Sequence, residues 1–300
     1  MRLGLIGLGT ISQYIKYGLE KSNNLKLAAV CDINKKCKNK ELFEKYPFYT
    51  DVIEMITKEK IDICYLAIDA EKHFNVASKI LKLGIPVITE KPACNSLTEL
   101  LKLYDLADAN KTYFEVLYHF EHGDEIKFLE QNISQYGPIK FIQSFAHEQY
   151  AYNDEHILSK DKYSVGDAWL DAGANLLSNI WHFIDLEDMA KLRDIKDFDK
   201  TSSKLIYSHK TFKNQFGVEI DLLIDWMTQN ETKYTIIQTQ KARIVIDHHD
   251  QTITANGKTI YNNTPKIHRM YIQYENAFKN YEYDVFNKEK TINIMKILEL

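Results

Sequence analysis

A short apolar run that leads into a glycine-rich turn restricts the fold of this chain more than any other feature. Residues 2–7 read RLGLIG, residues 7–12 read GLGTIS, and a helical pattern follows from residue 11 to residue 21. The first glycine allows a tight turn, and the second lets the backbone approach a pyrophosphate at the helix N-terminus. The third position, usually Gly or Ala, holds Ser12, which is still small enough for close packing of helix on strand. The segment therefore predicts a dinucleotide-binding strand–turn–helix unit.

An acidic residue stands where such a unit contacts the adenosine ribose. Asp32 follows a second apolar run, residues 25–31, and lies 23 positions after Gly9. A carboxylate there accepts hydrogen bonds from the ribose 2′-hydroxyl and repels a 2′-phosphate, which favours NAD over NADP. Lys35 and Lys36 come just after it and keep NADP as an alternative. Binding of another nucleotide, such as a methyl donor, or of none is the other interpretation of the turn.

The first 118 residues alternate between apolar runs and helical patterns. Further apolar runs lie at 61–68, 85–89 and 112–117, and helical patterns lie at 41–46, 51–59, 71–83 and 96–110. Strands that alternate with helices indicate a parallel sheet, and near-continuous apolar strands indicate that helices cover both of its faces. We expect a doubly wound α/β domain over residues 1–118.

The pattern changes after residue 118. A helix is expected near 123–135 and two more at 269–281 and 287–299, and Asn256-Gly257 predicts a hairpin turn. Alternating runs between them predict strands at 139–148, 203–209, 216–227, 234–239 and 243–247. We expect residues 119–300 to form an α+β domain with an open, mostly antiparallel sheet.

Composition excludes several classes of protein. The chain has 300 residues and a net charge of −4, which argues against nucleic-acid binding. Four cysteines without CxxC spacing favour reduced thiols in a cytoplasmic protein, and no apolar run is long enough to cross a membrane. Residues 247–250 read DHHD but lie between two short strands, so a polar turn is expected there. We predict no bound metal.

Residues 85–92, IPVITEKP, resemble the signature of the glucose–fructose oxidoreductase, inositol dehydrogenase and MocA family. The resemblance extends over residues 66–92 and includes His73, although Asp69-Ala70 replaces a turn that usually contains proline. It implies an oxidoreductase with a Rossmann domain, a second domain for substrate binding and oligomerisation, and a homo-oligomer, either dimer or tetramer. The residues that it assigns to the cofactor are Gly7, Gly9, Thr10, Ile11, Asp32, Ile68, His73, Glu90 and Lys91.

The resemblance also assigns a catalytic role to Lys91, at the nicotinamide end of the site. The chemistry supports that role independently, because ligands bind at the carboxyl edge of a parallel sheet. An ammonium there can hydrogen-bond to a substrate hydroxyl and polarise it.

A second segment, residues 166–182, reads GDAWLDAGANLLSNIWH. The family commonly has Asp followed four residues later by His, whereas this chain has Asp171 followed by Asn175. The Asp-x-Gly-x-Asn pattern, with Tyr118-His119 and Trp226, resembles the branch that contains L-arabinose 1-dehydrogenases and D-galactose 1-dehydrogenases. That branch oxidises an aldose at its anomeric carbon to a lactone.

Spacing gives these residues a chemical interpretation. Asp171 and Asn175 would share one helix face. An amide cannot act as an acid–base group, so Asp171 or Lys91 must accept the hydroxyl proton while Asn175 orients the hydroxyl. Asp171 could instead cap the helix. His119 and Glu148 are expected to line the sugar pocket, with an ordinary structural role as the alternative.

Two other functions stay open at this point. One is a related enzyme that acts on an inositol, a polyol or another secondary alcohol. The other is a non-catalytic regulator that binds NAD without turnover, an alternative that the missing histidine at position 175 supports.

Overall fold

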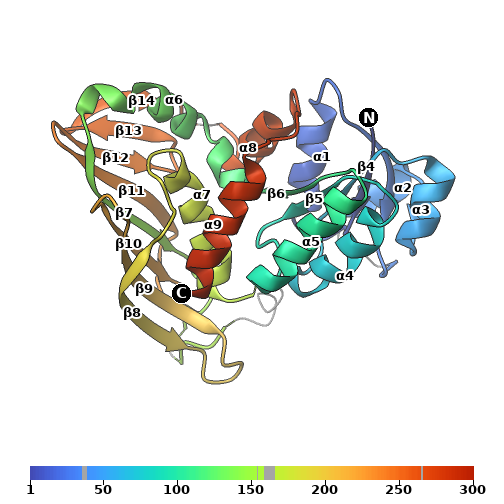
Figure 1. The fold of residues 1–300 in the computed structure, drawn as a ribbon, viewed down its shortest axis with the longest axis horizontal. Coiled ribbons are helices and arrows are strands. Elements are labelled where there is room, and N and C mark those ends of the chain that lie inside the picture. The colour runs from blue at the N-terminus through green and yellow to red at the C-terminus, as the bar shows by residue number, and fades with distance from the viewer. Residues whose placement is uncertain (36–38, 154, 159–165, 265) are drawn as a thin grey trace. The chain divides into compact units, whose positions relative to one another are not determined.

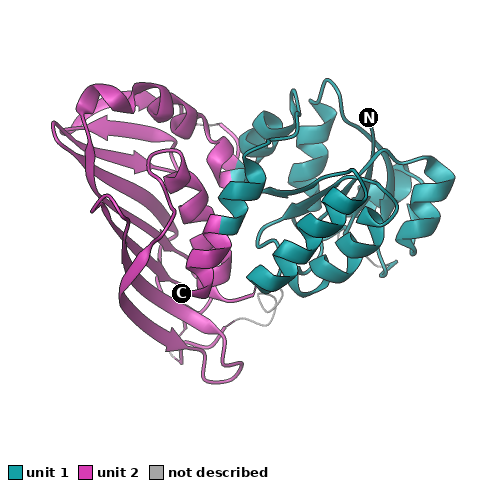
Figure 2. Cartoon of the chain, in the orientation of Figure 1, with its two compact units in different colours: residues 1–119, 270–292 teal, residues 120–269, 293–300 magenta. Residues whose placement is uncertain are grey.

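The chain divides into two compact units. The computed structural model describes residues 1–35, 39–153, 155–158, 166–264 and 266–300. The first unit contains residues 1–119 and 270–292, and the second contains residues 120–269 and 293–300 (Figure 2).

The first unit is built on a parallel sheet. Its strands, within the described residues, are β1 (Arg2–Ile6), β2 (Lys26–Cys31), β3 (Phe48–Tyr49), β4 (Ile63–Leu66), β5 (Val87–Glu90) and β6 (Phe114–Leu117). They lie in the order β3-β2-β1-β4-β5-β6, and neighbouring strands are parallel (Figure 1). This is the strand order of a dinucleotide-binding fold, with the change of direction at β1 and β4. The sequence did not predict β3, because two residues are too few to show a period.

Helices connect these strands, and side-chain caps fix where several of them begin. The connecting helices are α1 (Ser12–Glu20), α2 (Lys40–Lys45), α3 (Val52–Glu59), α4 (Ala70–Leu81) and α5 (Leu97–Ala109). Asn39, Asp51 and Ser96 each accept a hydrogen bond from the backbone N–H three residues later. Such caps satisfy amide groups that the first helical turn leaves unpaired. The predicted helices at 41–46, 51–59, 71–83 and 96–110 are therefore confirmed to within a few residues.

A helix from the C-terminal part of the sequence belongs to the first unit. Helix α8 (Arg269–Phe278) and the residues after it place Tyr274, Phe278 and Tyr281 in the buried core that also contains Leu5 and Tyr65. The sequence assigned both closing helices to the second domain, and the structure differs because these aromatic rings complete the core beneath the parallel sheet. The predicted second domain, residues 119–300, therefore includes a segment, residues 270–292, that belongs to the first unit in the structure.

The second unit is built on a mixed sheet. Its strands, as far as the structure describes them, are β7 (Ile139–His147), β8 (Ala190–Phe198), β9 (Leu205–Lys213), β10 (Glu219–Asp225), β11 (Thr232–Thr239), β12 (Arg243–Asp247), β13 (Thr252–Ala255) and β14 (Lys258–Asn262). The order is β14-β13-β12-β11-β7-β10-β9-β8, in which β7 and β10 pair in parallel and the other neighbours are antiparallel. The predicted fold class, a Rossmann domain with a mostly antiparallel open sheet, is confirmed.

Burial explains which of these strands the sequence could predict. Strand β9 alternates between buried and half-buried residues, which gives the period of two expected for a sheet with one covered face. Strand β8 lies at the edge of the sheet and is exposed along almost its whole length. Without a buried face it has no alternation, and the sequence analysis did not find it.

Helices of the second unit include α6 (Asp124–Asn132), a π-helical turn at Trp169–Gly173 and α7 (Ala174–Trp181); α9 (Asn287–Glu299) continues from the first unit into the second. Residues 247–250 form the predicted polar turn, in which Asp247 accepts hydrogen bonds from the backbone of His249 and Asp250. Within the described part of the chain, no group of three or more His, Cys, Asp or Glu side chains is arranged to hold a metal ion. None of the described helices is long and apolar enough to span a membrane.

The contact between α1 and α8 gives a prediction for Gly18. A Cβ atom at this position would lie 2.5 Å from the backbone oxygen of Tyr274. Although Ala is the better helix former by about 1 kcal/mol, Gly18→Ala should lower the free energy of unfolding by roughly 1–3 kcal/mol through overpacking. Urea denaturation followed by circular dichroism measures this change. Gly9→Ala is the matched control, because no described residue other than the chain neighbours of Gly9 has an atom within 4 Å of the added Cβ. A stabilised Gly18→Ala variant would contradict the packing argument.

Candidate active site

The glycine-rich turn lies where β1 meets the segment after β4. Gly7 has a φ of +97°, and a Cβ atom there would overlap the backbone carbonyl of Ala67. The amide of Gly7 donates a hydrogen bond of 2.8 Å to the carbonyl of Cys31 at the end of β2. Glycine is thus required at this position both for the backbone conformation and for the close approach of two loops.

Gly9 and the start of α1 have the features that a pyrophosphate site needs. Open space surrounds the position where a Cβ of Gly9 would lie, and Gly9 and Thr10 are exposed. The apolar side chain of Ile11 precedes α1 and cannot cap its amide groups. Ser12 is buried and its hydroxyl donates a hydrogen bond of 2.6 Å to the carbonyl of Gly9, so serine is accommodated at the third position of the motif. The turn fits a dinucleotide phosphate group.

Asp32 ties the end of β2 to the same turn. One carboxylate oxygen accepts a hydrogen bond of 2.8 Å from the amide of Leu8, and the other accepts one of 2.8 Å from the amide of Asn34. Each carboxylate oxygen retains a second acceptor position for a ribose hydroxyl. Of the lysines expected to affect cofactor choice, Lys35 is exposed and Lys36 lies outside the described residues.

His73 is a buried bridge between two loops at this edge of the sheet. Its ring nitrogens lie 3.0 Å from the carbonyl oxygens of Ile68 and Pro92, and its side chain is 1% exposed. Burial lowers the pKa of His73, although both carbonyls favour the protonated ring. The sequence analysis expected His73 and Ile68 to contact a cofactor directly. In the structure they join the end of β4 to the segment that carries Lys91.

Glu90 is the last residue of β5 and Lys91 follows it, and the two side chains have different surroundings. Glu90 is buried, and its Oε1 accepts hydrogen bonds from the hydroxyl groups of Tyr65, at 2.6 Å, and Tyr274. Burial raises the pKa of Glu90, while the two hydroxyl groups act in the opposite direction. Lys91 is half-buried. Cofactor binding by Glu90 stays a prediction, and two tyrosines hold its carboxylate in the protein interior.

His119 lies just after β6 and also contacts α8. Its Nδ1 lies 3.0 Å from the side-chain oxygen of Gln273, and its ring stacks on Tyr274 with centroids 5.6 Å apart. The side chain is 6% exposed. The sequence analysis gave no reason to place Gln273 or Tyr274 beside the predicted site, because α8 follows more than 150 residues later in the chain.

In the second unit, Asp171 lies inside the π-helical turn that precedes α7. Its amide donates a hydrogen bond of 3.0 Å to the carbonyl of Asp167. Asp167, rather than Asp171, caps the helix start, since its carboxylate accepts a hydrogen bond of 2.8 Å from the amide of Leu170. The capping alternative for Asp171 is therefore wrong. Turns of π-helix are rare and often occur at functional sites. The predicted α-helical spacing of Asp171 and Asn175 is changed by this turn, which widens the helix between them.

Polar groups next to Asp171 on the helix have unused hydrogen-bonding capacity. The side-chain oxygen of Asn175 is buried and has no hydrogen-bond partner among the described residues. Asn179, one turn further along α7, is fully buried, and neither its oxygen nor its nitrogen has a partner in that part of the chain. Unsatisfied buried polar groups are uncommon in native proteins, and they often indicate a bound molecule or water.

Glu148 is occupied by protein contacts. Its carboxylate accepts hydrogen bonds from the indole N–H of Trp226, at 2.9 Å, and from the ammonium of Lys233, at 2.6 Å. Sugar binding by Glu148 stays a prediction, and the two protein contacts fix the position of its carboxylate within the second unit. Tyr150, which the sequence analysis did not single out, has its pKa raised by burial and by the charges of Glu148 and Asp171. The hydroxyl group of Tyr150 therefore lies within electrostatic range of the Glu148 and Asp171 carboxylates.

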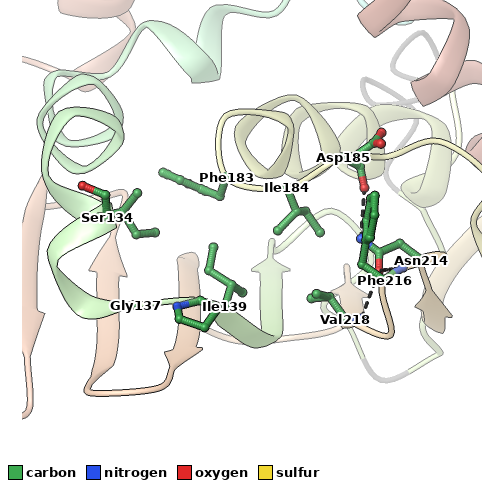
Figure 3. Close-up of a pocket in the computed structure, with 11 residues that line it drawn as sticks. Ser134, Gly137, Ile139, Phe183, Ile184, Asp185, Asn214, Phe216 and Val218 are labelled. Atoms are coloured by element: carbon green, nitrogen blue, oxygen red, sulfur yellow. Dashed lines mark hydrogen bonds between the residues drawn. The ribbon is translucent and has the colours of Figure 1, made fainter.

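A separate apolar groove of about 470 Å³ lies at one end of the second unit (Figure 3). Phe183, Ile184, Phe216 and Val218 contribute to its wall. Its lining, as far as the structure describes it, includes none of the predicted site residues. The groove is not part of the candidate active site.

Sequence comparisons with known proteins match part of the chain. A model of an oxidoreductase family with an NAD-binding Rossmann fold matches residues 1–118. The rhizopine catabolism protein MocA of Rhizobium meliloti is 26% identical over 132 residues, which cover 44% of this chain and 42% of MocA. The redox-sensing transcriptional repressor Rex 1 of Enterococcus faecalis is 24% identical over 127 residues, which cover 41% of this chain and 58% of the repressor. The alignments thus span about half the length of these relatives.

A similar fold extends over the whole chain. A 3-ketoreductase from Actinomadura kijaniata, solved with NADP and TDP-benzene, has a TM-score of 0.82 at 13% identity. The match covers 100% of this chain and 96% of that one. At this identity the comparison shows a shared fold and nothing finer.

The turn and the strand order give the first unit a Rossmann fold, and residues 1–118 match a family of oxidoreductases with an NAD-binding Rossmann fold. Residues 1–118 match the model of the glucose–fructose oxidoreductase, inositol dehydrogenase and MocA family, the family that the Glu90-Lys91-Pro92 segment resembles. The match agrees with the predicted NAD-binding fold of residues 1–118. Similarity to the arabinose and galactose dehydrogenases stays a prediction.

The open space at Gly9 gives a prediction for cofactor binding. In Gly9→Ala the added methyl group enters the space that a pyrophosphate would occupy, so NAD affinity should fall roughly tenfold or more, a loss of about 1.4 kcal/mol of binding free energy. Titration with NAD by calorimetry measures the affinity. Urea denaturation should show unchanged stability, since among the described residues only the chain neighbours of Gly9 come within 4 Å of the added Cβ. Equal NAD affinity in the variant and the native protein would show that the dinucleotide does not bind at this turn.

Proposed function

We propose that the protein is an NAD-dependent dehydrogenase that oxidises a cyclic aldose at its anomeric carbon to a lactone. The observation that carries the proposal is the arrangement at the carboxyl edge of the parallel sheet. The glycine-rich turn follows β1, Asp32 follows β2 and Lys91 follows β5. This edge is where α/β proteins of this topology bind ligands. Oxidoreductase chemistry at this edge is also what the family of the first unit suggests.

Three side chains would act on the anomeric hydroxyl during the reaction. Lys91 would donate a hydrogen bond to the anomeric hydroxyl and polarise it. Asp171 would accept the hydroxyl proton as the carbon–oxygen double bond forms, with Lys91 as the alternative base. Asn175 would orient the same hydroxyl, and its buried oxygen, which has no hydrogen-bond partner among the described residues, supports this role. Bound NAD supplies the acceptor for the hydride that leaves the anomeric carbon.

Asp32 supports NAD rather than NADP as the cofactor. Its carboxylate is fixed by the amides of Leu8 and Asn34, so a 2′-phosphate would meet a negative charge that cannot easily move away. NADP remains the alternative, with Lys35 exposed nearby in the sequence.

A charge-removing variant tests the cofactor choice. Asp32→Asn should raise the ratio of kcat/KM with NADP to that with NAD by roughly tenfold or more, since two unit charges about 4 Å apart interact by roughly 4 kcal/mol near a protein surface and about 1.4 kcal/mol is a factor of ten. Initial rates with each cofactor at saturating substrate measure the ratio. Asp51→Asn changes a cap elsewhere in the same unit and should leave the ratio unchanged. An unchanged ratio in Asp32→Asn would remove Asp32 from the cofactor site.

Two alternatives have their own support. Oxidation of an inositol, a polyol or another secondary alcohol would use the same groups, since Lys91 and Asp171 act on any hydroxyl. A non-catalytic NAD-binding regulator is supported by the similarity of the first unit to a redox-sensing repressor and by Asn175 in place of histidine.

We further propose a cytoplasmic homo-oligomer, a dimer or a tetramer, that uses a small sugar or polyol and binds neither nucleic acid nor membrane. Buried thiols at Cys31, Cys64 and Cys94 support a reducing compartment. The half-exposed face of the mixed sheet carries the aromatic rings of Phe145 and Tyr234, whose centroids lie 5.4 Å apart, and this supports an interface between copies.

Substitution of the two proton-handling groups tests the reaction. Lys91→Met and Asp171→Asn should each lower kcat by at least roughly 100-fold, the usual contribution of an acid–base or positioning group. Reduction of NAD, followed by absorbance across a panel of aldoses, inositols and polyols, measures the rate. Lys82→Met, at an exposed position after α4, is the control.

The substrates in this assay separate the alternatives. Turnover of a free aldose, lost when the anomeric hydroxyl is methylated, supports oxidation at the anomeric carbon. Turnover of inositols or polyols alone supports the related dehydrogenase. Tight NAD binding without turnover of any substrate supports the regulator. Near-normal rates in both variants would contradict the mechanism.

A further inference from the structure

Helix α8 and the residue three positions after it bring two tyrosines onto two buried carboxylates of the parallel sheet. Tyr274 donates a hydrogen bond to Glu90 of β5, and Tyr281 donates one to Glu115 of β6. Both carboxylates belong to the first unit, and both are less than 10% exposed. The two pairs are chemically alike. Glu90 is the residue before Lys91, whereas Glu115 lies on the neighbouring strand β6.

Glu90, the carboxylate of the first pair, accepts hydrogen bonds from two tyrosine hydroxyl groups. Tyr65 of β4 and Tyr274 of α8 both bond to Glu90 Oε1, and Tyr14 of α1 stacks on Tyr274 with ring centroids 6.4 Å apart. The ammonium of Lys91 also favours the ionised carboxyl. Short hydrogen bonds from two O–H groups to one oxygen stabilise the anion and fix its position. Glu90 is therefore held from β4 and from α8 together.

Tyr274 also holds a second residue of the predicted site. Its ring stacks on His119 at 5.6 Å with an interplanar angle of 22°, and the neighbouring Gln273 bonds to His119 Nδ1. One short segment of α8 thus contacts the carboxylate next to Lys91 and the imidazole after β6.

The second pair provides an internal comparison. The hydroxyl of Tyr281 bonds to Glu115 and contacts the hydroxyl of Tyr113, with 3.4 Å between the two oxygens. Glu115 lies in the middle of β6, and neither it nor Tyr113 was predicted to bind cofactor or substrate. This pair fastens the same region of the chain to the sheet with the same chemistry as the first.

We propose that Tyr274 is a positioning residue for the proposed reaction. It fixes Glu90 and His119, and through the peptide bond that follows Glu90 it sets the direction of Lys91. The proposal rests on the proposed function, because it takes Lys91 as the group that grips the substrate hydroxyl. Neither the family motif nor the cofactor fingerprint includes a residue from α8.

A matched pair of variants tests the proposal. Tyr274→Phe and Tyr281→Phe each remove one hydroxyl from a buried carboxylate and should destabilise the fold to a similar extent. Only Tyr274→Phe should lower kcat, by roughly tenfold to a hundredfold, the effect of a small displacement of a catalytic group. Its affinity for NAD, measured by calorimetry, should match that of the native protein. Equal kcat values in the two variants would overturn the proposal.

A second measurement does not depend on turnover. Pulse labelling with acetic anhydride over a range of pH, followed by mass spectrometry, reports the pKa of the Lys91 amine. Without the Tyr274 hydroxyl the buried Glu90 more readily takes up a proton, so Lys91 loses a neighbouring negative charge and its pKa should fall. In Tyr281→Phe it should stay at the native value.

The two measurements separate the two hypotheses. If the native protein turns over no substrate, the proposed function fails, while the labelling profile still decides whether Tyr274 controls Lys91. An unchanged labelling profile in Tyr274→Phe overturns the role of Tyr274 even when the native protein is active. Tyr65→Phe serves as the second variant if Tyr274→Phe does not fold, because it removes the other hydroxyl from Glu90 and keeps the α8 contacts to His119. It too should lower the pKa of Lys91, and a native labelling profile there would contradict the proposal.

Discussion

The close approach of the turn after β1 to the end of β4 is the constraint on which the first unit depends. Gly7 leaves no room for a side chain against the carbonyl of Ala67, and its amide bonds to the end of β2. The neighbouring Leu8 amide bonds to Asp32, which places the ribose-binding candidate against the phosphate-binding turn. The ring of His73 bridges the carbonyl of Ile68, after β4, and the carbonyl of Pro92, after β5. Three strand ends and the segment with Lys91 are thus connected by direct hydrogen bonds or contacts.

The second unit supplies a different kind of site. Its helix begins with a π-helical turn that contains Asp171, and Asp167 takes over the capping role. Leaving a buried polar group without a hydrogen bond costs about 1–3 kcal/mol, so the buried oxygen of Asn175, which lacks a partner in the described part of the chain, is an unfavourable feature of the fold alone. Glu148, by contrast, has both carboxylate oxygens satisfied by Trp226 and Lys233. Glu148 thus has one protein partner on each oxygen, whereas the buried oxygen of Asn175 has none among the described residues.

Helix α8 shows how distant sequence contributes to the site. Tyr274 and Phe278 fill the core beneath the parallel sheet, and the same segment bonds to Glu90 and contacts His119. Local sequence indicates a helix there, but it does not indicate which sheet the helix covers. That choice depends on the apolar surface left open by the strands and on two buried carboxylates that need hydrogen-bond donors.

The sequence by itself determined the elements whose pattern is local. The glycine-rich turn, Asp32 at the end of a strand and the alternation of strands and helices predicted the Rossmann domain, because spacing and backbone conformation are written in adjacent residues. Tertiary structure alone decided the sheet to which α8 belongs, the edge strand β8, and the surroundings of Glu90, Glu148 and His73. Those outcomes depend on burial and on hydrogen-bond partners far away in the chain, and the sequence carries no short-range signal for them.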